Sequence, residues 1–262
     1  MIIAGIDSGA KNTKTVILKD GKSIGRGKAL TGFDLMKAVK ASLAEALNQA
    51  GIQWEDIYMV AGTGSGKEAI TIADVKVSDI QAMARAAHYF FPRVRTVADV
   101  GAEEGRAAKL DDKGDIDDFT INEKCASGAG SFIEAMARAL EVTIEEMGTL
   151  CLQSNKEIPM NAQCAIFAES EVVGLIHAKT AKADISKAIH DSMASRIATM
   201  IRRIGVNPDV MMIGGMANNP GFIAAVEREL KTDIILIPEK PEFGAAIGAA
   251  LAASEEYQAN EA

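Results

Sequence analysis

The chain has 262 residues, 48% of them hydrophobic, so it can bury a large core and form two modest lobes. Its 28 basic and 36 acidic residues give a net charge of −8 without a basic stripe, which argues against nucleic acid or an anionic membrane as a partner. The longest apolar stretch, Ala245–Ala253, is too short to span a bilayer, no signal-peptide pattern opens the chain, and three cysteines suggest no secreted disulfide framework, so we expect a cytoplasmic protein.

The first ninety residues predict two strands followed by two helices. The strands are apolar runs joined through small and polar turn residues, and a hairpin turn follows at Asp20-Gly21. The helices carry apolar residues at helical spacing, and Ser78 is a plausible cap for the second. In chain order the expected elements are Met1–Ile6, Thr13–Leu18, Asp34–Ala50 and Asp79–Phe90.

This opening pattern recurs further along the chain. A strand at Thr96–Ala98 ends in Asp-x-Gly, as the first strand does, and a second strand again follows and ends in a turn. The equivalent pairs, each 92 residues apart, are Asp7 and Asp99, Lys14 and Arg106, and Leu18 and Leu110. Several matches in one register indicate two copies of a strand–turn–strand–turn–strand unit.

The second half is mostly helical, with two short strands near its end. We expect residues 1–94 with 240–262 to form one lobe and 95–239 to form the other, and the polar tail Ser254–Ala262 to fray. The expected elements are helices at Ser131–Leu140, Thr143–Gln153, Ala165–Leu175, Lys182–Ile204, Pro220–Leu230 and Glu242–Ala253, and strands at Val210–Ile213 and Ile234–Ile237.

The two Asp-x-Gly turns are candidate phosphate sites. Backbone amides in such a turn can face an anion, the carboxylate can reach a hydrated metal, and small side chains let phosphate oxygens approach closely. Either turn alone is as well explained as an ordinary hairpin, but their repetition favours two turns that hold a phosphate chain. The candidate residues are Ser8, Gly9, Ala10 and Lys14 in the first turn and Gly101 and Ala102 in the second.

Two further glycine-rich segments invite a nucleotide interpretation. Gly214 and Gly215 end an apolar strand and precede Met216 and Asn218, so an adenine could lie against this backbone. The segment GTGSGK at residues 62–67 is not a P-loop, because a P-loop requires Gly at position 61 and Ser or Thr at position 68, where this chain has Ala and Glu. We expect it to be a flexible turn near the cleft between the lobes.

Two of the three cysteines, Cys125 and Cys164, each lie in a loop that runs into a helix. Helix N-termini favour thiolates and the anionic clusters that thiolates bind. An iron–sulfur cluster needs four such ligands, so two chains could share one cluster across a two-fold axis. The alternative is a pair of buried structural cysteines, the commonest fate of intracellular cysteine. Cys151 lies on the apolar face of a helix and is expected in the core.

These segments resemble a known family. The chain is similar to the ATP-dependent activators of 2-hydroxyacyl-CoA dehydratases and the ATPase subunits of benzoyl-CoA reductase, within the acetate and sugar kinase, heat-shock 70 and actin superfamily. The resemblance extends from Met1 to about Ala253 and is carried by GIDSGAKNTKTVIL, GGMANN, EFGAAIGAALAA, NEKCASGAGSF and NAQCAIFAESEVV. It implies an α/β, two-lobed, duplicated actin-like (ribonuclease H-like) ATPase fold with a nucleotide cleft between the lobes.

The resemblance also implies cofactors, partners and roles. ATP and Mg²⁺ would bind between the lobes, with Asp7, Asp99 and Glu103 as catalytic residues. Cys125 and Cys164 of two subunits would ligate one shared [4Fe–4S] cluster. ATP hydrolysis would drive low-potential electrons, supplied by a ferredoxin or flavodoxin, to a separate iron–sulfur catalytic subunit that binds acyl-CoA.

One departure from the family pattern bears on the partner. The second phosphate loop of homodimeric activators reads DIGGQD, whereas here Ala102, Glu103 and Glu104 replace its last three residues. This departure, which adds one carboxylate at Glu103, favours the small ATPase subunit of a benzoyl-CoA reductase, paired with a larger sister subunit. The alternatives are a stand-alone homodimeric activator of a 2-hydroxyacyl-CoA dehydratase, a small-molecule kinase of the same fold, and a nucleotide-binding regulatory subunit.

Overall fold

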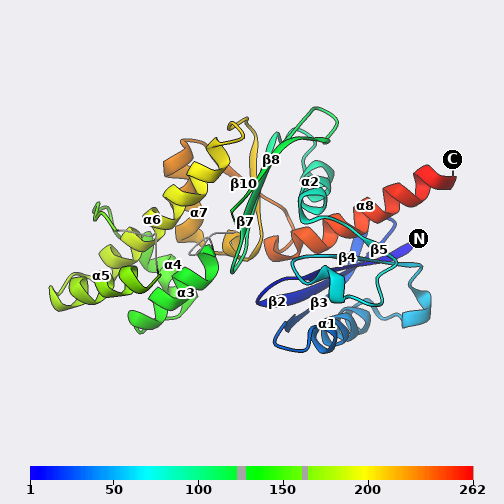
Figure 1. Cartoon of the computed structure of the whole chain (residues 1–262), viewed down its shortest axis with the longest axis horizontal. Coiled ribbons are helices and arrows are strands. Elements are labelled where there is room, and N and C mark those ends of the chain that lie inside the picture. Colours follow the sequence, from blue (N-terminus) through cyan, green and yellow to red (C-terminus); the bar gives the residue numbers. More distant parts are fainter. Residues whose placement is uncertain (123–127, 161–164, 262) are drawn as a thin grey trace. The chain divides into compact units, whose positions relative to one another are not determined.

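The computed structural model describes residues 1–122, 128–160 and 165–261. The chain divides into two compact units (Figure 1), of which the first contains residues 1–94, 110–116 and 237–262 and the second contains residues 95–109 and 117–236. The hairpin tip Leu110–Ile116 groups with the first unit, whereas the sequence division placed it in the second. No helix within the described ranges is long and apolar enough to cross a membrane.

The first unit is built on a five-stranded mixed sheet in the order β3-β2-β1-β4-β5. Helix α1 packs along β2 and β3, and α8 packs on β1 and α2. The bounds are β1 (Ile2–Ser8), β2 (Asn12–Lys19), β3 (Lys22–Leu30), β4 (Met59–Thr63), β5 (Val75–Lys76), α1 (Leu35–Ala50), α2 (Asp79–Phe90) and α8 (Gly244–Glu261).

The second unit is built on a sheet of the same kind in the order β10-β9-β6-β7-β8, covered by helices from the later part of the chain. Its strands are β6 (Thr96–Val100), β7 (Gly105–Leu110), β8 (Ile116–Asn122), β9 (Val210–Ile213) and β10 (Ile234–Leu236). Its helices are α3 (Ala129–Ala139), α4 (Ile144–Cys151), α5 (Ala165–His177), α6 (Lys182–Arg202) and α7 (Pro220–Leu230).

The two sheets are copies of one design, which confirms the predicted duplication. The two strand orders coincide when the strands are matched in sequence, β1 with β6, β2 with β7, β3 with β8, β4 with β9 and β5 with β10. Asp7 lies opposite Lys14 in the first antiparallel pair, and Asp99 lies opposite Arg106 in the second. Both aspartates therefore stand at the carboxyl end of a central strand, where ligands of α/β sheets bind.

Local sequence explains where the helices and turns begin. The Ser78 side chain accepts a hydrogen bond from the Gln81 amide and starts α2, as predicted. The turn between β2 and β3 places Asp20 and Gly21 at φ of +50° and +78°, a conformation that Asp and Gly tolerate well.

Small residues allow α8 to lie close to its neighbours. A Cβ on Gly5 of β1 would come within 1.9 Å of the Ala246 carbonyl oxygen, and a Cβ on Gly248 within 1.7 Å of the Ala82 carbonyl oxygen. The helix does not stop at Ala253. It continues to Glu261, beyond the end at Ala253 that the sequence predicted. Glu255 pairs with Arg85 at 3.0 Å, and the ring of Tyr257 packs edge-on against Tyr58.

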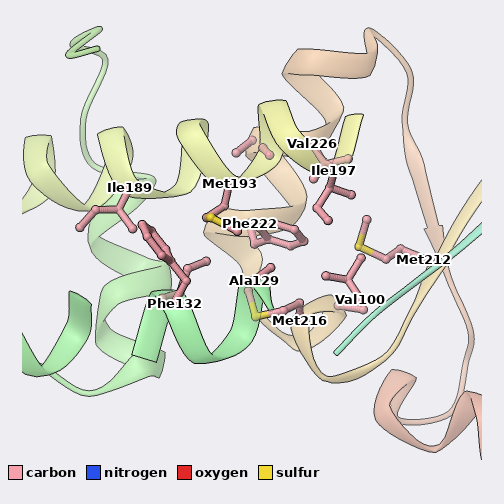
Figure 2. Packing of buried hydrophobic residues seen from close by; sticks show 14 of the residues in the cluster. Val100, Ala129, Phe132, Ile189, Met193, Ile197, Met212, Met216, Phe222 and Val226 are labelled. Carbon is pink, nitrogen blue, oxygen red and sulfur yellow. The ribbon is translucent and has the colours of Figure 1, made fainter. Parts of the chain in front are cut away.

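The core of the second unit is formed by helices α3 to α7 against β6, β7 and β9. Figure 2 shows the fully buried Phe222 of α7 among Met193 of α6, Ala129 of α3 and Met216. The first turn of α3 is thus packed into this core, and its position is set by the same contacts that hold the sheet.

Candidate nucleotide-binding site

The first candidate half-site surrounds Asp7 at the end of β1. Lys14 Nζ lies 2.6 Å from Asp7 Oδ2, and only 10% of the Asp7 side chain and 13% of the Lys14 side chain is exposed. The Gly9 amide donates to the Asn12 carbonyl oxygen at 3.2 Å and closes the turn between β1 and β2. Gly9 is partly exposed and Ala10 and Lys11 are exposed, so a phosphate could meet the backbone of this turn.

The second half-site surrounds Asp99 at the end of β6. Its turn is closed in the same way, by the Gly101 amide donating to the Glu104 carbonyl oxygen at 2.9 Å. The basic residue is placed differently, because Arg106 Nη1 lies 4.0 Å from Asp99 Oδ2 while its Nη2 pairs closely with the Glu104 carboxylate. Glu104 therefore draws the guanidinium away from Asp99.

A glycine lies directly against each aspartate. Gly64 follows β4 with φ of +93°, and a Cβ there would come within 2.4 Å of Asp7 Oδ1. Gly214 follows β9 with φ of +92°, and a Cβ there would come within 2.3 Å of Asp99 Oδ1. Both the positive φ and the lack of space require glycine. The sequence pattern singled out Gly214 but indicated only a flexible turn around Gly64.

The Gly64–Gly66 segment also covers Ser8. The Gly66 amide donates to the Ser8 carbonyl oxygen at 2.9 Å, and a Cβ on Gly66 would lie 2.5 Å from Ser8 Oγ. Ser8 is fully buried, and its hydroxyl and that of Thr63 have no hydrogen-bond partner within the described part of the chain. Ser8 thus meets the packed side of the turn rather than its open side.

The proposed adenine-binding residues divide into two groups. A Cβ on Gly215 would meet nothing within 4 Å, and the Asn218 side chain donates to the Gly215 carbonyl oxygen at 3.3 Å, so this surface is open. Met216 is buried in the core beside Ala129 and Val100 (Figure 2), so its side chain packs the fold.

In the second turn, the side chain of Glu103 contacts helix α3. Ala102 is partly exposed and Glu103 is exposed, and the Glu103 carboxylate accepts a hydrogen bond from the Ser131 hydroxyl at the start of α3. The sequence resemblance assigned Glu103 to catalysis and gave no partner for it.

The carboxylates suit an indirectly held magnesium ion. Mg²⁺ takes oxygen ligands, keeps several waters and is usually bound through one or two carboxylates together with phosphates. Asp7 and Asp99 are such carboxylates, and in each unit a glycine leaves no side chain over Oδ1. Over the described ranges no group of three or more His, Cys, Asp and Glu is placed to hold a metal by itself.

The two cysteines predicted as cluster ligands, Cys125 and Cys164, lie outside the described residues. Cys151 is buried, as predicted, with its thiol 3.7 Å from the Gly221 carbonyl oxygen. Burial raises the pKa of the Cys151 thiol to about 11, so it stays protonated and unreactive.

Comparison with known proteins decides the family. The model of the BadF/BadG/BcrA/BcrD ATPase family matches residues 4–253. The chain belongs to this ATPase family. The resemblance inferred from the sequence motifs and the actin-like fold class are both confirmed.

Among relatives in the family, the chain is 39% identical to the activator of lactoyl-CoA dehydratase from Anaerotignum propionicum, over 98% of this chain and 99% of that protein. It is 31% identical to one of the benzoyl-CoA reductase subunits of Thauera aromatica, over 95% and 92%. The structure of the activator of 2-hydroxyisocaproyl-CoA dehydratase from Clostridium difficile with bound ADPNP superimposes with a TM-score of 0.93 at 34% identity, covering 100% of this chain and 97% of that one.

Proposed function

We propose that the chain is the ATP-dependent electron-transfer activator of a 2-hydroxyacyl-CoA dehydratase. The observation that carries the proposal is the pair of glycine-covered aspartates, Asp7 and Asp99, in a chain that matches dehydratase activators over nearly its whole length. This partner differs from the one that the Glu103 and Glu104 departure favoured, because identity to the lactoyl-CoA dehydratase activator is 39%, against 31% to the benzoyl-CoA reductase relative.

Both aspartate turns would take part in nucleotide binding. We infer that the open backbone of each turn, at Ala10 and Ala102, faces phosphate oxygens, while Asp7 and Asp99 orient waters around a magnesium ion that neutralises phosphate charge. Lys14 adds a positive charge beside the first turn. The open surface at Gly215 is the proposed place of the adenine.

The proposed electron carrier is a [4Fe–4S] cluster shared by two chains, which would supply a single low-potential electron. Cys125 and Cys164 of each chain would hold it as thiolates. Its acceptor would be an iron–sulfur dehydratase component that binds acyl-CoA, and its electrons would come from a ferredoxin or flavodoxin. The chain's own task is to couple nucleotide turnover to this transfer.

A second candidate is the small ATPase subunit of a benzoyl-CoA reductase, which would pair with a larger sister subunit. One observation favours it: the Ala102-Glu103-Glu104 loop departs from the pattern of homodimeric activators. In that case the chain alone would hydrolyse ATP slowly and would hold its cluster poorly, since half of the ligands would belong to the sister.

The deciding experiment measures iron and electron transfer in anaerobically purified protein. We expect about two irons per chain for one four-iron cluster in a homodimer, and ATP-dependent reduction of a purified 2-hydroxyacyl-CoA dehydratase component. Cys125→Ser and Cys164→Ser should each lose the iron, and Cys151→Ser is the matched control that keeps it. Full iron in the Cys125 variant would refute the cluster. Electron transfer only to benzoyl-CoA reductase catalytic subunits, in the presence of a sister chain, would establish the second candidate.

A further inference from the structure

Helix α3 begins directly on the second phosphate turn. The Gly130 amide donates to the Gly101 carbonyl oxygen at 3.1 Å, and the Ser131 amide donates to the Ala102 carbonyl oxygen at 3.0 Å. The Ser131 hydroxyl donates to the Glu103 carboxylate. Three consecutive residues of the turn are thus each bonded to the first turn of α3.

Two glycines make this contact close. A Cβ on Gly128 would lie 2.2 Å from the Ala102 carbonyl oxygen and 2.7 Å from Glu103 Cα, and a Cβ on Gly130 would lie 2.9 Å from Ala102 Cα. All of these neighbours are backbone atoms, which cannot swing aside as the end of a side chain can. The phosphate turn and the start of the helix are therefore packed in direct backbone contact.

The contact also replaces an ordinary helix cap. Residue Gly128 has no side chain to cap α3, so the carbonyl groups of the phosphate turn accept the hydrogen bonds of its first amides. In the first unit, by contrast, α1 is capped by its own Asp34, whose side chain accepts from the Lys37 amide. The first-turn amides of Gly130 and Ser131 are consequently used by the turn and are not available to a thiolate or a cluster.

We propose that Ser131 is a positioning residue that couples the phosphate turn to α3 through Glu103. The inference rests on the proposed function, because Cys125 lies three residues before Gly128 in the sequence, so the segment that carries it leads directly into this contact. Nucleotide that binds at the turn near Gly101 displaces Glu103, and the hydrogen bond between Glu103 and Ser131 transmits this displacement to the helix. In this proposal the Glu103 carboxylate links the turn to the positive N-terminal end of α3 and does not act as a general base.

Two substitutions separate coupling from charge. Ser131→Ala removes the hydroxyl that donates to the Glu103 carboxylate and leaves both backbone hydrogen bonds in place. Glu103→Gln removes the charge but keeps an oxygen that accepts from Ser131. Thr149→Ala is the matched control, because the Thr149 hydroxyl is exposed on α4 and donates to the Glu145 carbonyl oxygen of its own helix at 3.2 Å.

The test is hydrogen exchange of the anaerobically purified protein with and without Mg²⁺ and a non-hydrolysable ATP analogue, read in peptides that cover residues 128–140. In the wild type the analogue should change exchange of the α3 start. Ser131→Ala should reduce that change by about two- to tenfold, the range of one hydrogen bond, while calorimetry shows nearly unchanged analogue affinity. Glu103→Gln and Thr149→Ala should respond like the wild type.

The outcomes that contradict the inference are distinct. Analogue binding without any response at α3 would overturn the coupling, and a full response in Ser131→Ala would overturn the role of Ser131 in it. Either result would leave the proposed function standing. A wild-type protein that fails to bind Mg²⁺–nucleotide at all would overturn the proposed function and the coupling with it. Loss of ATP hydrolysis in Glu103→Gln with an intact α3 response would return Glu103 to catalysis.

Discussion

Gly64 and Gly214 occupy equivalent positions in the two units. Each follows the strand that pairs in parallel with the aspartate strand, each has a φ above +90°, and each lies against Oδ1 of its aspartate. The equivalence was hidden in the sequence because the two segments share little beyond one glycine. In each unit, therefore, the backbone of a glycine holds one side of the aspartate carboxylate, and no side chain on that side can move to make room.

Replacing Gly64 with Ala should lower Mg²⁺–nucleotide affinity by at least about tenfold. The new Cβ displaces Asp7, and the positive φ adds strain of about 1–2 kcal/mol. Titration calorimetry measures the affinity. Gly51→Ala is the matched control, because Gly51 also has a positive φ of +66° but a Cβ there meets nothing within 4 Å. It should lower the melting temperature and leave nucleotide binding unchanged. Equal affinities in both variants would contradict the assignment.

Asp7→Asn and Asp99→Asn should each reduce Mg²⁺–ATP hydrolysis by about a hundredfold, because an amide orders the waters of a metal ion less well than a carboxylate does. The iron content should stay close to that of the wild type. The melting temperature should fall more in the Asp7 variant, which weakens the largely buried 2.6 Å ion pair with Lys14, than in the Asp99 variant, whose pair with Arg106 is 4.0 Å long. Phosphate release under single-turnover conditions is the measurement. Undiminished hydrolysis in both variants would place the nucleotide elsewhere.

Glu104→Gln should raise the Mg²⁺ concentration required for half-maximal hydrolysis by about three- to tenfold. Without the Glu104 charge, Arg106 is released toward Asp99, which lies 4.0 Å away, and competes with the ion for that carboxylate. A magnesium titration at saturating ATP measures the effect. Glu229→Gln, which breaks the exposed pair with Arg202, serves as the control and should show no change. A lower magnesium requirement would show that Glu104 instead repels the nucleotide.

His190 predicts a pH-dependent stability. Burial lowers the pKa of His190 below its ordinary value of 6.5, and Arg228 adds a smaller lowering effect. The Ser186 carbonyl oxygen, which lies 2.8 Å from Nδ1, and the side chains of Asn219 and Asp191 act in the opposite direction but do not cancel the shift. The unfolded state therefore binds a proton more readily than the folded state. The free energy of unfolding should fall as the pH drops below about 6.5, by at most about 1.4 kcal/mol per pH unit from this group.

Urea unfolding between pH 7.5 and 5.5 tests this expectation. His190→Asn removes the titrating group and should flatten the dependence, whatever its effect on stability at pH 7.5. His177→Asn, at the exposed end of α5, is the control and should keep the wild-type slope. An unchanged slope in the His190 variant would assign the pH dependence to other groups.

Cys151 should resist alkylation in the folded protein. Its thiol is buried and its pKa is raised to about 11, so little thiolate forms at pH 8. Mass spectrometry after iodoacetamide treatment should find Cys151 labelled only once the protein is unfolded in guanidinium chloride. Rapid labelling of the native protein would show that the α4 region opens readily.

Elements with local signals were predictable from the sequence. The predicted cap at Ser78 and the apolar spacing that follows Asp34 located two helices to within one residue, and Val210–Ile213 is a strand with the expected bounds. The repeat predicted the duplicated sheets, because the offset of 92 residues places Asp7 and Asp99 at the same position of each hairpin.

Features that depend on long-range contacts were not predictable. The short strand β4 shows no alternation of apolar and polar residues, so its pairing with β1, and with it the contact of Gly64 with Asp7, has no local signal. Likewise the polar sequence at the end of α8 gives no local sign of a helix, and the ion pair of Glu255 with Arg85 that supports it is a long-range contact. The link between Ser131 and Glu103 joins residues 28 positions apart, which only the fold brings together.

The path of the chain between the units has a consequence for how the protein is made. The first unit needs α8, which is synthesised after the whole of the second unit, because α8 fills the space over Gly5 and against Ala82. The second unit lies wholly within the chain and is complete by Leu236. A ribosome therefore delivers every residue of the inserted unit while the sheet of the first still lacks its covering helix, and truncations before Ala246 should release a chain with one folded unit and one that is sensitive to proteases.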